Sequence, residues 1–197
     1  MARTTTRKTA SPATAAPDEA ACLEAFLACV EEGGLDRAGL PQVAARAGVP
    51  LAGLYRLFPT RRALLEGLLR RSDLAMLEEA DAAGLDLETS PRDRLFDLVL
   101  ARLGTLAPRR EAIRVLWHDA RRHPLAFASL APAMLASLRL MVEAAGFSAD
   151  GLAGARRVTA LGRVYARVLP VWLDDDPADL ARTMAELDRR LRDGPFA

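Results

Sequence analysis

The stretch LPQVAARAGVPLAGLYRLF, residues 40–58, decides the interpretation of this 197-residue chain. Pro41 is favoured in the first turn of a helix and Gly48 just after its end, so a short helix is expected over 41–47. A second short helix follows the glycine and is cut by Pro59. Two short helices joined by a tight glycine turn are a helix-turn-helix candidate, a unit whose second helix enters the major groove of DNA.

The charge distribution supports a contact with a polyanion on one side of the molecule. The whole chain has 27 basic and 26 acidic residues and a net charge of +1, so it has no general preference for a polyanion. Residues 37–71, however, contain seven arginines and the single acid Glu66, a local net charge of +6. The opposite bias occurs near the end of the chain, at Asp174, Asp175, Asp176 and Asp179. This asymmetry predicts one basic surface at the N-terminal end.

Composition points to a helical protein of a reducing compartment. Hydrophobic residues make up 51% of the chain, and the abundant alanine, leucine and arginine are strong helix formers. Cys22 and Cys29 are separated by about 10 Å of helical rise, too far for a disulfide, and are expected to be small core residues. The N-terminus lacks the apolar region of a secretory signal, and no apolar run approaches the roughly 18 residues that span a bilayer. The sequence predicts a soluble, cytoplasmic protein without a membrane partner.

Prolines, glycines and apolar periodicity predict nine helices and no strand, an all-α fold. A Thr/Ala/Pro/Ser-rich arm over 1–17 is expected to be disordered. An amphipathic first helix ends at Gly33-Gly34. Beyond the helix-turn-helix, helices are expected over about 60–83, 91–106, 109–122, 125–145, 152–173 and 177–191, with Thr60 capping the first of them. Pro132 is expected to kink the 125–145 helix.

The stretch VAARAGVPLAGLYRLFPTRRALL resembles the N-terminal domain of the TetR family of transcriptional regulators, in which a pattern of the type IA..AGVS..TLYRYF.SKE.LL recurs. The positions that match are Val43, Ala44, Ala47, Gly48, Val49, Leu54, Tyr55, Phe58, Leu64 and Leu65. The resemblance implies a TetR-like fold, with a helix-turn-helix domain over 18–66 and a helical ligand-binding and dimerisation domain over 67–197. It also implies a homodimer joined by the last two helices, which binds a palindromic double-stranded DNA operator. Such a protein is expected to act as a repressor that responds to a small apolar ligand.

Eight residues of the motif are predicted to contact DNA: Pro50, Leu51, Gly53, Tyr55, Arg56, Thr60, Arg61 and Arg62. Phosphate contacts are assigned to Tyr55, Thr60 and Arg61, together with the backbone N–H groups at the start of the helix that follows. A solvated basic face is the alternative interpretation of Arg61 and Arg62. The family usually has serine where this chain has Pro50, and often lysine and threonine where it has Leu51 and Gly53. Only Arg56 is left to read a base by bidentate hydrogen bonds.

Larger side chains of the helical body are candidates for a ligand cavity. They are Trp117, Phe127, Met134, Leu138, Tyr165 and Trp172, for which ordinary core packing is the alternative. His118 and His123 are five residues apart and do not share a helix face, so no metal site is expected. The sequence contains no nucleophile–base pair and no phosphate-cradling loop, so neither an enzyme nor a cofactor is expected.

A second resemblance leaves another function open. The segment VTALGRVYARVLPVWLDDDPADLARTMAELDRRL, residues 158–191, is similar to the C-terminal part of the ubiquinone-biosynthesis accessory protein family. The shared features are a helix carrying Tyr165, the Trp172-Leu173-Asp174 run and a final amphipathic helix. Proteins of that family share the TetR-like fold but bind isoprenoid lipids. The alternative is therefore a lipid-binding accessory protein of isoprenoid quinone biosynthesis with a vestigial helix-turn-helix.

Overall fold

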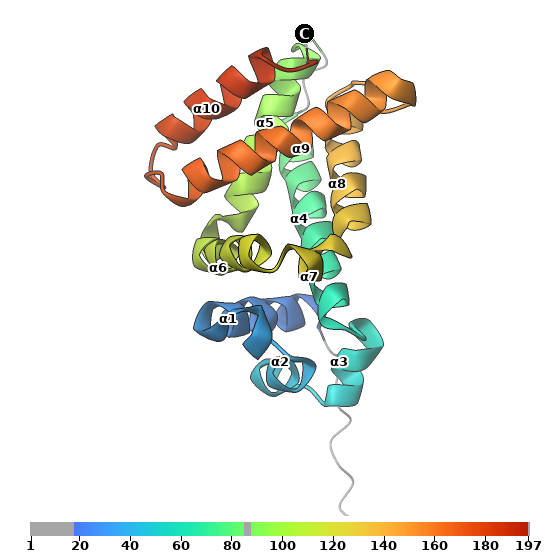
Figure 1. Ribbon diagram of the computed structural model, residues 1–197, viewed down its shortest axis with the longest axis vertical. Coiled ribbons are helices and arrows are strands. Elements are labelled where there is room, and N and C mark those ends of the chain that lie inside the picture. The colour runs from blue at the N-terminus through green and yellow to red at the C-terminus, as the bar shows by residue number, and fades with distance from the viewer. Residues whose placement is uncertain (1–17, 85–87, 197) are drawn as a thin grey trace, which may run out of the picture.

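The protein is all-helical, as predicted. The computed structural model describes residues 18–84 and 88–196, so the arm expected over 1–17 lies outside the described residues. Within these ranges there are ten α-helices, one 3-10 turn and no strand (Figure 1). The helices are α1 (Glu19–Arg37), α2 (Leu40–Ala47), α3 (Leu51–Leu57), α4 (Arg61–Ala83), α5 (Pro91–Leu106), α6 (Arg110–Arg122), α7 (Pro124–Ala128), α8 (Ala131–Ala144), α9 (Gly151–Leu173) and α10 (Ala181–Arg192).

Helices α1, α2 and α3 form one end of the molecule (Figure 1), and their buried apolar residues are part of the hydrophobic core of the protein. Gly48 ends α2 in the left-handed conformation, with φ 67°, which a glycine adopts without steric cost. The chain then turns through Pro50 into α3, whose Leu54 is fully buried. Phe58 closes this core against Gly67 of α4, where a Cβ atom would lie only 2.5 Å from the phenyl ring.

Helix α4 connects this end to the larger helical body. The Thr60 side chain caps it by accepting a hydrogen bond from the Ala63 N–H at 3.0 Å. In the body, α4, α5 and α8 run along the molecule, and α9 crosses them with α10 packed beside it (Figure 1). Helix α6 lies at the base of the body, where it packs on α1. The two parts are thus connected by the continuous α4 and by the α1–α6 contact.

The predicted bounds of α4, α5, α6 and α9 are confirmed to within one residue, whereas two other predictions are wrong. The helix expected over 125–145 is two helices, α7 and α8, separated at Ser129 and Leu130. Pro132 does not kink a helix but lies in the first turn of α8, where its missing N–H leaves no hydrogen bond unmade. The last helix does not begin at Pro177 but at Ala181, after Leu180 in a left-handed conformation.

The cysteines are core residues, as predicted. Cys22 and Cys29 are buried free thiols of α1, and burial raises the pKa of both thiol groups.

Across residues 18–84 and 88–196, no helix combines the length and apolar character that crossing a membrane requires.

Candidate nucleic-acid interface

One face of α3 is open to solvent and carries the side chains that could reach a ligand. Leu51, Ala52, Tyr55 and Arg56 are all exposed, because residues four apart lie on the same side of a helix. Leu51 is 48% exposed and Tyr55 is 58% exposed. Gly53 is buried beside Leu54 on the opposite side of the helix. Gly53 as a DNA contact stays a prediction, although the inner face of α3, on which it lies, packs against the rest of the domain.

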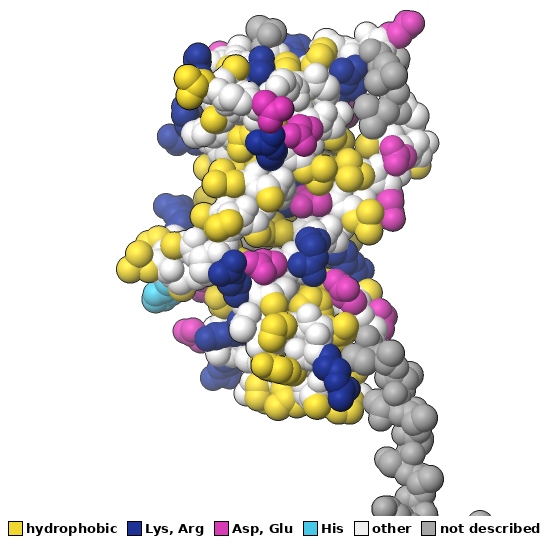
Figure 2. Space-filling view, turned by 90° about the vertical axis from the view of Figure 1, so that its right-hand side faces the viewer, with side chains coloured by type: hydrophobic (Ala, Val, Ile, Leu, Met, Phe, Trp, Pro, Cys, Tyr) yellow, Lys and Arg dark blue, Asp and Glu magenta, His cyan; other side chains and the backbone are white. Residues whose placement is uncertain are grey.

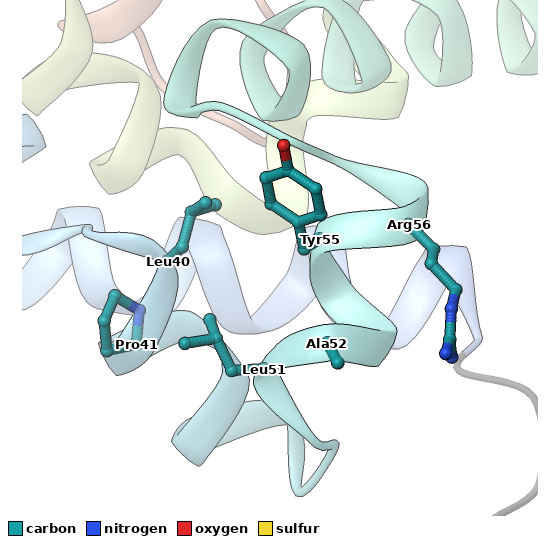
Figure 3. A pocket seen from close by; sticks show the side chains of 6 residues that line it. All are labelled: Leu40, Pro41, Leu51, Ala52, Tyr55 and Arg56. Carbon is teal, nitrogen blue, oxygen red and sulfur yellow. The ribbon is translucent and has the colours of Figure 1, made fainter.

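This face of α3 forms a shallow pocket of about 610 Å³ with the start of α2. Its lining residues are Leu40, Pro41, Leu51, Ala52, Tyr55 and Arg56. Leu51 points toward Pro41 and Leu40, Tyr55 rises from the middle of the group, and Arg56 extends at the far side (Figure 3). In the space-filling view, hydrophobic side chains gather over this end of the molecule with basic side chains beside them (Figure 2). The surface is thus apolar at its centre and basic at its margin.

Arg56 is the charged side chain of this face that is available to an external partner. It is exposed and forms no hydrogen bond or ion pair within the described parts of the chain. A guanidinium group offers five donors in a planar fork, which suits the two acceptors of a guanine edge or of a phosphate. The structure shows Arg56 exposed, and its contact with DNA stays a prediction.

The two arginines at the start of α4 are exposed but bound within the protein. Arg61 donates a hydrogen bond from Nη1 to the carbonyl oxygen of Leu35 at 2.9 Å and lies 4.0 Å from an Asp36 carboxylate oxygen. Arg62 donates from Nε to Glu66 at 2.7 Å, one turn further along α4. Both arginines keep further donors, but their first partners are residues of this chain.

Leu35 also connects the small domain to the body, a contact that the sequence analysis missed. The Leu35 N–H donates to the Asp119 carboxylate of α6 at 2.9 Å. The preceding Gly34 has φ 72° and ψ −178°, a conformation essentially restricted to glycine, so α1 is kinked at this point. The two peptide groups of Leu35 are therefore held from two sides, the N–H by α6 and the carbonyl by Arg61 of α4. The nearby His118 and His123 are exposed.

The residues predicted to line a ligand cavity are spread over four helices of the body. Trp117, Phe127, Leu138 and Tyr165 are half-buried against the core, whereas Met134 is 49% exposed. Trp172 is fully buried, with the Arg110 guanidinium 4.6 Å from its ring centre. Besides the α3 pocket, the structure has a pocket of about 570 Å³ between the start of α5 and the end of α10, and one of about 400 Å³ between α4 and α5. None of these three pockets is lined by the predicted ligand residues.

A buried polar cluster crosses the centre of the body. Arg102 of α5 donates to the Asp73 carboxylate of α4 at 2.5 Å, and the Ser137 hydroxyl of α8 donates to the same oxygen at 2.6 Å. Tyr165 of α9 lies beside it, with its ring 5.8 Å from the Arg102 guanidinium, and burial raises the pKa of its hydroxyl. A sequence signal for this buried cluster exists, because each charged residue lies close to buried apolar residues of its own helix. Asp73 lies near Met76 in α4, and Arg102 lies next to Leu103 in α5. The cluster was missed because such a residue finds its partner only in the folded protein.

Comparison with known proteins supports the function of this end of the molecule. The family of bacterial regulatory proteins, tetR family, matches residues 23–68. An uncharacterized HTH-type transcriptional regulator of Mycobacterium bovis is 36% identical over 66 residues, which are 34% of this chain and 35% of that protein. The chain thus spans about a third of the length of the curated relative that it matches.

The whole fold is shared with solved regulators. The TetR transcriptional regulator from Nitrosomonas europaea superposes with a TM-score of 0.70 at 22% identity, covering 91% of this chain and 98% of that one. A TetR regulator from Rhodococcus sp. RHA1 gives a TM-score of 0.61 at 21% identity, covering 88% of this chain and 92% of that one. The helix-turn-helix segment carries the family match, and the body carries the same architecture. Residues 23–68 thus match the family of bacterial regulatory proteins, tetR family, and the chain as a whole shares the fold of the two solved regulators.

Proposed function

We propose that this protein is a transcriptional regulator that binds double-stranded DNA through α2, α3 and the start of α4. The observation that carries the proposal is the solvent-facing side of α3, which lies inside the segment that matches the family. On this side, Arg56 has no partner within the described chain. Five of the seven arginines over residues 37–71 form exposed ion pairs with acids of this chain, so that only their remaining donors are left for phosphates. These five are Arg46, Arg61, Arg62, Arg70 and Arg71. Pro50, Leu51, Tyr55, Arg56 and Thr60 are the contacts that we assign to it, with the remaining donors of Arg61 and Arg62 for the phosphates.

A fluorescence anisotropy titration against the DNA upstream of its own gene tests this role. Binding at low ionic strength should weaken steeply with added salt, because each neutralised phosphate releases counterions. Arg56→Ala should weaken binding and relax the sequence preference, whereas loss of a phosphate contact should weaken binding to all sequences alike. A protein that binds no duplex at low salt is not the regulator proposed here.

We further propose that the regulator is a homodimer joined through α9 and α10, with the small domain over 18–66 and the body over 67–197. The two helices pack side by side, and their exposed residues combine small and apolar side chains, such as Ala166 and Met184, with arginines such as Arg163. Two small domains held at a fixed separation match two half-sites of a palindromic operator. The role that we propose for this dimer is repression.

A small apolar ligand in the body is the proposed signal. Trp117, Phe127, Met134, Leu138 and Tyr165 remain the residues that we assign to it, since four of them are half-buried at the edge of the core. A shift of α6 caused by a ligand would reach the small domain through Asp119 and Leu35. Native mass spectrometry of the purified protein tests this, because a bound ligand adds its own mass to the 21.3 kDa chain.

The relatives named above are regulators, which gives no support to the lipid-binding accessory alternative.

A further inference from the structure

We infer that the apolar part of the α3 face selects thymine in the operator, by contact of Leu51 and Ala52 with the C5-methyl group of the base. The inference rests on the proposed function, since it concerns the same surface in contact with DNA. It assigns a source of sequence preference to a recognition helix that has a single strong polar reader, Arg56.

The position of the two apolar residues on α3 is the first step. In helix-turn-helix proteins, the N-terminal residues of the recognition helix contact base edges. In α3 these residues are Leu51 and Ala52, and both are exposed. Leu40 and Pro41 extend the same apolar surface from the start of α2 (Figure 3). The part of the helix closest to the bases is therefore the part without polar groups.

The chemistry of the major groove then leaves one favourable partner. Guanine presents two acceptors, cytosine a donor and adenine one of each, whereas thymine presents an acceptor and a methyl group. A leucine or alanine side chain that displaces water from a polar edge leaves that edge without a hydrogen-bond partner. Only the thymine methyl gains from contact with an apolar side chain. The surface around Leu51 thus favours thymine and disfavours the other three bases.

The spacing along α3 adds a register. Ala52 and Arg56 are four residues apart and lie on the same side of the helix, separated by about 6 Å of helical rise, which corresponds to roughly two steps of the 3.4 Å base-pair spacing. Arg56 suits a guanine, whose two acceptors match its fork. Each half-site of the operator should therefore contain a thymine about two base pairs from a guanine.

The test compares thymine with uracil, which lacks only the methyl group. Duplexes that bind the full-length protein are enriched from a random pool and resynthesised with deoxyuridine at the half-site thymines. Affinity should fall about fourfold for each thymine methyl group removed from the surface, from the transfer free energy of one buried methyl-sized group. Deoxyuridine placed outside the half-sites should leave the affinity unchanged.

Two variants assign the effect to the α3 surface. Leu51→Ala should bind thymine and uracil duplexes more equally, whereas Arg56→Ala should bind both more weakly and keep their ratio. Leu125→Ala is the matched control, because Leu125 is an 89% exposed leucine on α7 and should change nothing. Equal affinity of the wild-type protein for thymine and uracil half-sites, or enriched half-sites without thymine, would overturn the inference alone. A pool that shows no enrichment overturns the proposed function, and the inference with it.

Discussion

Among single residues, Asp73 and Arg102 are expected to matter for stability, because their charges are paired inside the body. Asp73→Ala leaves the Arg102 guanidinium buried without its carboxylate partner, which should cost about 3 to 5 kcal/mol of unfolding free energy. Urea denaturation measures this loss. Arg139→Ala is the control, since it breaks exposed ion pairs with Glu143 and Asp150 that solvent already screens. A similar small loss in both variants would show that the buried pair is not a structural requirement.

Asp175 ties the stability of the α9–α10 connection to pH. Its carboxylate accepts hydrogen bonds from the hydroxyl and the N–H of Thr183, at 2.6 and 2.7 Å, and these hold its pKa below the usual value. A lowered pKa in the folded state stabilises the protein above the unfolded-state pKa of about 4 and loses that contribution as the pH falls further. Asp175→Asn should therefore lower the Tm at pH 7, and the difference from the wild type should shrink below about pH 4. Thermal melts across this range measure it, and a constant difference would contradict the assignment.

At the scale of helices, the kinked end of α1 connects the small domain to the body. Asp119→Ala removes the acceptor of the Leu35 N–H, and a hydrogen bond to a charged group contributes about 1.5 to 3 kcal/mol. Hydrogen exchange of the Leu35 amide should accelerate, because the local opening of this segment becomes easier. Asp119→Asn retains an acceptor oxygen and should restore much of the protection. Unchanged exchange at Leu35 in the alanine variant would mean that α1 is held by its apolar contacts with α6.

Helices also show how far the sequence determines the structure. The bounds of α4 follow from local chemistry, the Thr60 cap and the terminal Gly84, and they could be predicted. The division between α7 and α8 could not, because a proline favours both a kink and a first turn, and neighbouring helices decide between them. The start of α10 depends on Asp175, six residues before the helix begins at Ala181.

The candidate site was predictable to the same extent. The exposed positions of Tyr55 and Arg56 follow from the helical register of α3, which the motif fixes. The burial of Gly53 and the bonding of Arg61 to Leu35 are tertiary contacts, without a signal in the local sequence. A motif thus locates the surface, while packing decides which of its side chains are available.

For the whole molecule, the proposed dimer makes a prediction that links the far end of the body to DNA. Ala166 is exposed on α9, and Ala166→Glu would place a larger, charged side chain in the proposed contact between two copies. The variant should sediment as a 21.3 kDa monomer, whereas the wild type should sediment at twice this mass. Its affinity for a palindromic duplex should fall about a hundredfold or more, because the second half-site no longer adds to the first.

Binding to a duplex with one half-site separates this effect from damage to the DNA surface. The variant and the wild type should bind a single half-site alike, since α3 and its pocket lie at the other end of the molecule from α9 and α10 (Figure 1). Ala82→Glu, at an exposed position of α4 outside the proposed interface, serves as the control for an added charge. If Ala166→Glu remains a dimer, the interface does not lie on this face of α9. If it becomes a monomer but binds the palindrome as tightly as before, the two small domains do not act together on DNA.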